Sequence, residues 1–343
     1  MANFRSLPST LLTLGLVSFS SVHAEENQTL VFEGKQGPGK GKHIVFLAGD
    51  EEYRSEEGLP QLAKILAERQ GFKCTVCFSI NKNGEIDPNT GNNEPGIEAL
   101  DTADACVMLL RFRAWPEAQM KHFVDYYQAG KPFIALRTST HAFNFPGNSP
   151  YSKFTWNNKE WPGGFGRQVL GETWINHWGG HKSQATHPVI EPSQKDNPLL
   201  RGVSDIFVTT DVYEAEPQDD VKVLLRGQVL SGMKPTDAPA TNTKKRKDGT
   251  EQGINDPMMP IAWTREAKNE SGKTNKVLCM TMGAASDLPN EDLRRLIVNG
   301  VFWECGLEVP AKADVSLVGD FQPTFYGFNG GKKGVKPADL QAK

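Results

Sequence analysis

The chain has 343 residues, of which 38 are Lys or Arg and 41 are Asp or Glu, so its formal net charge at pH 7 is −3. This mildly acidic balance gives no electrostatic basis for binding nucleic acid, and the short basic run at 244–247 is most simply a solvated loop. Five cysteines, an odd number, leave at least one thiol unpaired in a monomer.

Residues 1–24 have the pattern of a secretory signal peptide. Arg5 precedes an apolar stretch at 11–17, and Val22 and Ala24 are small residues spaced as at a signal-peptidase site. The apolar stretch is shorter than the roughly 20 residues that span a bilayer, and no later segment reaches that length. We therefore expect cleavage near Ala24 and an exported protein, periplasmic or extracellular, without a membrane span.

After a polar leader at 25–41, apolar strand patterns alternate with helical ones. Strands are predicted at 42–50, 72–80, 103–112 and 131–137, and helices at 59–71 and from Pro116 onward. Such alternation predicts an α/β fold, a three-layer sandwich with a mostly parallel central sheet. Cys74 and Cys77 form a C-x-x-C within one strand, where residues three apart face opposite sides, which disfavours a redox pair.

The second half of the chain is less regular. An aromatic, glycine-rich loop at 143–182 is followed by predicted strands at 221–230, 260–266 and 276–283, with a polar insertion at 232–256. A helix at 290–306 precedes an extended C-terminal arm at 307–343. The elements indicate a single elaborated domain over 42–306. Ligands of such sheets bind at the carboxyl ends of the strands, so residues there are the first functional candidates.

Four groups of segments resemble the trehalose-utilization (ThuA-like) family. They are GKPFIALRTSTHAF at 130–143, VLGETWINHWGGHKSQATHPVI at 169–190, DVYEAEP at 211–217, and PIAWTRE at 260–266 with KVLCMTMG at 276–283 and RRLIVNGVFW at 294–303. The family fold is similar to the class I glutamine amidotransferase-like and flavodoxin-like α/β sandwich. One departure is Ala284, where many members have a His after Gly283.

The amidotransferase comparison raises glutaminase chemistry, which needs a cysteine at the strand-to-helix turn. No cysteine lies between Cys106 and Cys279, so we exclude a glutaminase. Ser139 lacks the G-x-S-x-G setting of an exposed nucleophile, and an ordinary capping hydroxyl is the simpler interpretation.

The resemblance implies acid/base residues in the loops at the strand ends. His141 and His177 occupy positions where the family has histidines, and Glu214 lies in the segment DVYEAEP. Each has an ordinary alternative, a loop histidine with a hydrogen-bonding partner or a solvated glutamate. The three side chains also form a ligand set for a divalent metal, which the sequence leaves open.

Substrate-binding candidates share a predicted position on the same rim or in the aromatic loop. They are Glu52, Arg54, Arg113, Arg137, Glu172, Trp178 and Tyr213. Charged groups bond sugar hydroxyls and aromatic rings stack on sugar faces, although ion pairs within the rim and buried tryptophans give the same sequence pattern.

The resemblance thus implies a small carbohydrate ligand. The leading hypothesis is an exported enzyme acting on a sugar or keto-sugar, by isomerisation or by elimination or hydrolysis of a 3-keto-glycoside. The alternative is a non-catalytic carbohydrate-binding protein that uses the same pocket. No cofactor or oligomeric state follows from these residues.

Overall fold

The structure is a computed structural model that describes residues 1–2 and 28–341. The predicted signal peptide, apart from Met1 and Ala2, lies outside the described residues. Within the described part of the chain, no helix combines the length and the apolar character needed to cross a membrane.

A nine-stranded sheet forms the centre of the described residues. In spatial order its strands are β1 (Leu30–Phe32), β3 (Lys73–Phe78), β2 (His43–Gly49), β4 (Ala105–Leu110), β5 (Phe133–Leu136), β13 (Thr274–Met280), β12 (Met259–Lys268), β9 (Lys222–Val229) and β7 (Thr186–Ile190). The five strands from β3 to β13 pair in parallel, and the outer pairs are antiparallel. The predicted α/β sheet with a parallel centre is confirmed.

Helices cover both faces of this sheet. The α-helices are α1 (Ser55–Gln70), α2 (Glu117–Gln128), α3 (Glu291–Glu304) and α4 (Pro337–Gln341). Short helical turns are η1 (Ile97–Thr102), η2 (Arg137–His141), η3 (Ser152–Phe154), η4 (Gly166–Leu170), η5 (Pro192–Gln194), η6 (Pro198–Leu200) and η7 (Ala285–Asp287). Helix α1 ends at the expected Gly71 but begins four residues before the predicted start, and Glu56 and Glu57 in its first turn favour that end of a helix.

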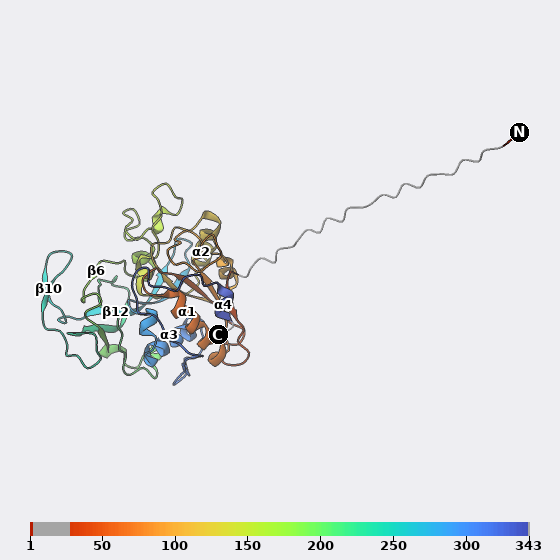
Figure 1. Ribbon diagram of the computed structural model, residues 1–343. Helices are drawn as coiled ribbons and strands as arrows, with labels where there is room; N and C mark the ends of the chain where they lie inside the picture. The colour runs from red at the N-terminus through yellow and green to blue at the C-terminus, as the bar shows by residue number, and fades with distance from the viewer. Residues whose placement is uncertain (3–27, 342–343) are drawn as a thin grey trace.

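Two apolar cores lie on opposite faces of the sheet. Alternate residues of β2 divide between them: Ile44 and Phe46 pack with the core that contains α1 and α3, and Val45 and Leu47 with the core that contains α2. Figure 1 shows α2 on the opposite side of the sheet from α1 and α3. This three-layer arrangement explains why the central parallel strands β4 and β5 are apolar along their whole length.

The cysteines belong to these cores. All five thiols are free, and Cys74 and Cys77 lie in different cores, on the two faces of β3. Burial raises the pKa of both thiols well above the ordinary value. Neither thiol has the properties of a redox group.

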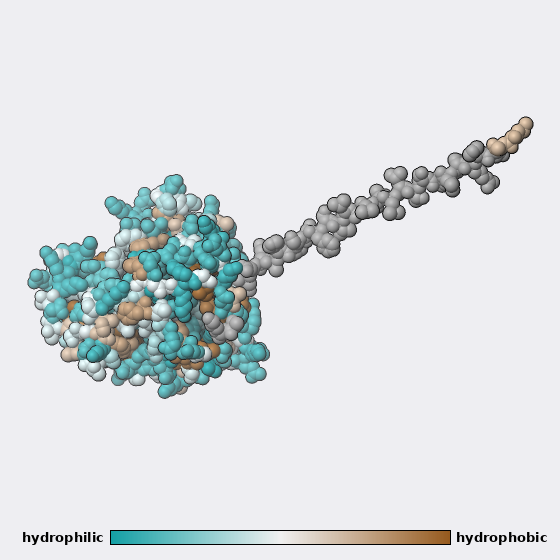
Figure 2. Space-filling view, in the orientation of Figure 1, coloured by the Kyte–Doolittle hydropathy of each residue, from teal (hydrophilic) through white to brown (hydrophobic). Residues whose placement is uncertain are grey.

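Two small sheets lie outside the central one. Strands β6 (Asn176–His177) and β8 (Tyr213–Glu214) pair beside the sheet, and β10 (Thr243–Lys245) and β11 (Glu251–Gly253) form a hairpin within the polar insertion. Figure 1 shows β10 at the edge of the molecule farthest from α4. Hydrophilic residues cover most of the face seen in Figure 2.

Candidate active site

Loops that follow β2, β4 and β5 meet at the carboxyl edge of the parallel strands. In each loop a residue other than glycine adopts a left-handed backbone: Arg54 (φ 59°), Phe112 (φ 53°) and Arg137 (φ 41°). Such conformations cost about 1–3 kcal/mol each and concentrate at functional sites. The strained backbone therefore marks this edge as the place to look for chemistry.

Arg137 and Asp211 form a fully buried ion pair at the centre of this edge. An Nη2–H of Arg137 donates to Asp211 Oδ1 at 2.8 Å, and Nη1 donates to the backbone oxygens of Asp211 and Thr281, each at 2.6 Å. The guanidinium lies 3.8 Å from the ring centre of Tyr213 and 4.7 Å from that of Tyr53. The contacts fix the carboxylate in one orientation.

Two histidines donate to the same carboxylate. His177 Nδ1 lies 2.7 Å from Asp211 Oδ2, and His181 Nδ1 lies 3.1 Å from Oδ1. Burial alone would raise the pKa of the Asp211 carboxyl, but Arg137 and the two histidines outweigh it and hold that pKa well below its usual range. An ionised carboxylate only accepts hydrogen bonds, so both Nδ1 atoms carry protons.

The two histidines differ in what their second nitrogen contacts. His181 Nε2 lies 3.1 Å from Glu52 Oε1, so His181 bridges two carboxyl groups. Burial, followed by the nearby Asp50, raises the pKa of Glu52. For His177 Nε2, no hydrogen-bonding partner is found in the described part of the chain, and the side chain is 32% exposed. His177 is therefore the imidazole that is both oriented by Asp211 and open to a ligand.

Local pairing places His177 in this position. In the antiparallel pair of β6 and β8, His177 is opposite Tyr213, and the two ring centres lie 5.4 Å apart. The ring of His177 also lies 4.7 Å from that of His181. The two glycines between them disfavour a regular helix, and the segment that joins the two histidines is irregular.

His141 lies on the other side of Trp174 and Tyr213. Its ring centre is 5.6 Å from that of Trp174 and 6.4 Å from that of Tyr213, and both rings also contact His177. Phe112 is 5.0 Å away on the same wall. Burial, with the positive charges of Arg111 and Arg137, lowers the pKa of His141 well below its ordinary value, so this imidazole is neutral at neutral pH.

This lowered pKa makes the stability of the fold depend on pH. Unfolding returns His141 to its ordinary pKa of 6.5, so the unfolded chain binds more protons below that pH and folding loses stability as pH falls. We expect His141→Gln to remove roughly 1 kcal/mol per pH unit of this loss below about pH 6.5, measured by chemical unfolding. His187→Gln, at an exposed histidine, is the control. An unchanged pH slope in His141→Gln would contradict the assignment.

Glu214 is not part of this group. It follows Tyr213 in the two-residue strand β8, and adjacent strand residues face opposite sides, so Glu214 points away from the face that carries Tyr213. Both of its carboxylate oxygens accept from the backbone N–H of Lys247, at 3.0 and 3.2 Å, in the polar insertion. The structure therefore brings His141 and His177 to one site and Glu214 to another.

Of the predicted substrate-binding residues, some lie in the site and the others make structural contacts elsewhere. Glu52, Arg137 and Tyr213 lie in the site. Arg113 pairs with Glu51 at 2.8 Å, and Glu172 pairs with Arg167 at 2.8 Å. The remaining two also have structural contacts: Arg54 Nε donates to Thr324 Oγ1 at 2.9 Å, and the fully buried Trp178 donates to the backbone oxygen of Ile254 at 2.7 Å.

A metal ion, if bound, has a different ligand set from the predicted one. One ligand atom from each of His177, His181 and Asp211 lies within 4.8 Å of the others. His141 and Glu214 do not belong to this group. However, the buried guanidinium of Arg137 already neutralises the Asp211 carboxylate, which weakens the attraction of this site for a cation.

Sequence reasoning passed over two residues of the site. His181 and Asp211 stand within the segments VLGETWINHWGGHKSQATHPVI and DVYEAEP, but neither is among the candidate site residues predicted there. The available signal was that both residues lie in segments that carry the family resemblance. Ser139 is buried and donates to the backbone oxygen of Met108 at 3.0 Å, which agrees with an ordinary hydroxyl.

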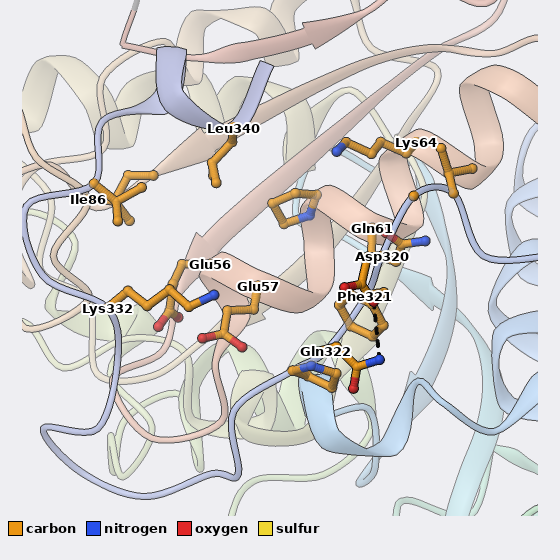
Figure 3. A pocket seen from close by; sticks show the side chains of 15 residues that line it. Glu56, Glu57, Gln61, Lys64, Ile86, Asp320, Phe321, Gln322, Lys332 and Leu340 are labelled. Atoms are coloured by element: carbon orange, nitrogen blue, oxygen red, sulfur yellow. Dashed lines mark hydrogen bonds between the residues drawn. The ribbon is translucent and has the colours of Figure 1, made fainter. Parts of the chain in front are cut away.

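A cavity of about 590 Å³ lies elsewhere, between α1 and the C-terminal arm (Figure 3). Its lining includes Glu56, Glu57, Lys64, Phe321 and Lys332, and none of the histidines. Burial raises the pKa of Glu56 to about 8. The lining has no pair of histidines on a shared carboxylate, so we place the candidate active site at the sheet edge.

The protein is therefore of the α/β class, and its candidate site lies at the carboxyl ends of the parallel strands, where ligands of such sheets bind. The chain belongs to the ThuA family, described as trehalose utilisation, whose model matches residues 42–304. No curated protein matches the chain.

Two solved structures similar to the chain are ThuA-like proteins. One, from Bacteroides uniformis ATCC 8492, is 16% identical with a TM-score of 0.46, and the match covers 79% of this chain and 93% of that one. The other, from Parabacteroides merdae ATCC 43184, is 12% identical with a TM-score of 0.48, and the match covers 79% and 92%.

Proposed function

We propose that this protein is an exported enzyme that acts on a sugar or keto-sugar by proton transfer, with His177 as the acid/base group. The observation that carries the proposal is the 2.7 Å contact between His177 Nδ1 and the buried Asp211 carboxylate, which leaves Nε2 open. A carboxylate behind an imidazole fixes its tautomer and stabilises the imidazolium that forms when Nε2 takes a proton. N-terminal sequencing of the protein recovered outside the cytoplasm tests the export and the cleavage after Ala24.

A keto-sugar suits this arrangement. The C–H bond next to a keto group is acidic enough for Nε2 to remove its proton; the C–H electron pair forms a C=C bond, and the π pair of the keto group moves to its oxygen. Return of the proton to the former keto carbon, with transfer of the hydroxyl proton of the neighbouring carbon to the former keto oxygen, completes an isomerisation. Departure of the glycosidic oxygen, with its C–O bond pair and a proton from an acid, completes an elimination. Both reactions begin with the same proton removal at His177.

His141 and the aromatic residues supply the rest of the site. A neutral imidazole can donate an N–H hydrogen bond to an oxyanion that develops on the substrate. The lowered pKa keeps His141 in this neutral form. Phe112, Trp156 and Trp174 form a partly exposed wall beside it, with ring centres 5.8 and 6.1 Å apart along the row. Aromatic faces of this kind stack on the C–H faces of sugar rings.

The charge balance of the site favours proton transfer over metal catalysis. Asp211 already accepts from Arg137, His177 and His181, so a cation would compete with three donors for one carboxylate. Covalent catalysis by a thiol is also disfavoured, because Cys106 and Cys279 are fully buried within strands β4 and β13.

The test is a screen of the mature protein against native disaccharides and their 3-keto forms, before and after dialysis against EDTA. We expect turnover of a 3-keto disaccharide, none of the native sugar, and full retention of the activity after dialysis. Loss of activity that zinc or manganese restores would contradict the metal-free mechanism. Binding of sugars without any product would favour the non-catalytic carbohydrate-binding alternative.

A further inference from the structure

The C-terminal arm, residues 307–341, completes the site although it lies beyond the residues that match the family. The backbone N–H of Gly327 donates to the backbone oxygen of Glu52 at 2.8 Å. The buried ring of Tyr326 lies 5.1 Å from Tyr53 and 5.5 Å from His181, and its hydroxyl donates to the backbone oxygen of Thr209 at 3.1 Å. The arm is therefore one wall of the His–Asp site.

Polar contacts hold the arm in this place. The Glu57 carboxylate accepts from the backbone N–H and the hydroxyl of Thr324, at 2.7 and 2.8 Å, and Arg54 donates to the same hydroxyl. Figure 3 shows the arm at 320–322 beside Glu57 and Gln61 of α1. Since these contacts fix both ends of the short segment 324–327, the residue that follows, Phe328, has a defined position.

Phe328 extends the aromatic wall of the site outward. Its side chain is 53% exposed, and the Arg111 guanidinium lies 5.1 Å from its ring centre. The same guanidinium lies 4.6 Å from the ring of Phe112, which contacts His141 and Trp156. An ion pair with Glu51 holds Arg111 between the two rings. A continuous row therefore runs from the arm to the acid/base residues.

We propose that Phe328, Arg111 and Phe112 form an outer subsite for the second sugar ring of a glycoside, while the first ring lies at His177. The proposal rests on the function proposed above. The exposed phenyl ring of Phe328 offers a flat face to the C–H groups of a pyranose. The guanidinium between the rings adds N–H donors for sugar hydroxyls. The arm thus selects disaccharide-like substrates over single sugars.

Phe325 gives a matched control within the same arm. It is 50% exposed, close to the exposure of Phe328, but its ring stacks on Tyr326 at 4.4 Å and Arg111 has no contact with it among the cation–ring contacts of the described residues. Replacement of either phenylalanine by alanine removes an exposed ring, so neither change should unfold the protein. Only the change at Phe328 removes the proposed subsite.

The experiment compares kcat/KM for a 3-keto disaccharide and for the matching 3-keto methyl glycoside. We expect Phe328→Ala to lower kcat/KM for the disaccharide about fivefold to tenfold and to change that for the methyl glycoside less than about twofold. Phe325→Ala should leave both values unchanged. Equal losses on both substrates, or no loss on either, would overturn the subsite.

Two further outcomes separate the subsite from the proposed function. If the wild-type protein turns over neither substrate, the proposed function fails, and calorimetric binding of the two sugars then tests the subsite alone by the same comparison of variants. If Phe328→Ala alters the oligomeric state and not the affinity for the disaccharide, the ring serves contact between copies and the subsite is refuted.

Discussion

Replacing Asp211 by asparagine is expected to lower kcat for a keto-sugar by roughly 10³-fold or more, with a much smaller change in KM. The amide no longer fixes His177 with its proton on Nδ1, and it cannot stabilise the imidazolium. Asp211 is buried beneath the histidines, so it acts through His177 and not on the substrate. Steady-state kinetics on the substrate found in the screen gives the separation of kcat from KM.

A second Asp–His pair in the same chain serves as the control. His187 Nε2 lies 3.0 Å from Asp205 Oδ1 at the surface, where the side chains are 44% and 79% exposed. Asp205→Asn should leave both kinetic constants unchanged. His177→Gln should match the loss of kcat in Asp211→Asn and keep wild-type stability, because His177 is partly exposed. A folded Asp211→Asn protein with nearly normal kcat would refute the assignment of His177.

Replacing Arg137 by methionine is expected to lower the free energy of unfolding by about 3–5 kcal/mol, measured by urea titration. The change leaves the Asp211 carboxylate buried without its counter-charge and removes the donors to the backbone oxygens of Asp211 and Thr281. Methionine fills a similar volume, so the loss reflects charge and hydrogen bonding more than an empty cavity.

The matched control is Arg226, whose side chain is 35% exposed and pairs with Glu191 at 2.6 Å. Arg226→Met should cost about 1 kcal/mol or less, because solvent screens this pair. Adding Asp211→Asn to Arg137→Met should restore part of the stability, since the orphaned charge is then gone. A cost at Arg137 no larger than that at Arg226 would show that the buried pair does not hold the site together.

The fold was predictable because the period of the apolar residues is a local signal. Strands at 43–49, 73–78 and 105–110 fall inside the predicted ranges, and the alternation of strands with helices sets a parallel sheet. The same logic placed His141 at the edge of the sheet, because it follows β5 directly. A residue just beyond a parallel strand has its position fixed by the strand itself.

The rest of the site depends on contacts that no local pattern encodes. Asp211 and His181 lie in irregular segments: Asp211 meets Arg137 across 74 positions of the chain, and His181 meets Asp211 across 30. Glu214 illustrates the opposite case: it lies three residues after Asp211, yet alternation along β8 directs it into the polar insertion. The adjacent residues Tyr213 and Glu214 therefore face opposite sides of β8, so that the first belongs to the site and the second to a structural contact.

The left-handed backbone at Arg54, Phe112 and Arg137 constrains the evolution of this protein, because it sets stability against the side chains of the site. Glycine at any of the three positions would relieve backbone strain of order 1 kcal/mol, but at Arg137 the loss of the buried ion pair with Asp211 outweighs that gain. At Phe112, whose ring is partly exposed, glycine would relieve the strain and delete part of the aromatic wall. Selection for heat resistance alone would thus favour glycine at Phe112, whereas selection for turnover keeps the strained phenylalanine. A more heat-stable relative with glycine at the position of Phe112 should accordingly have lost the aromatic wall beside its histidine.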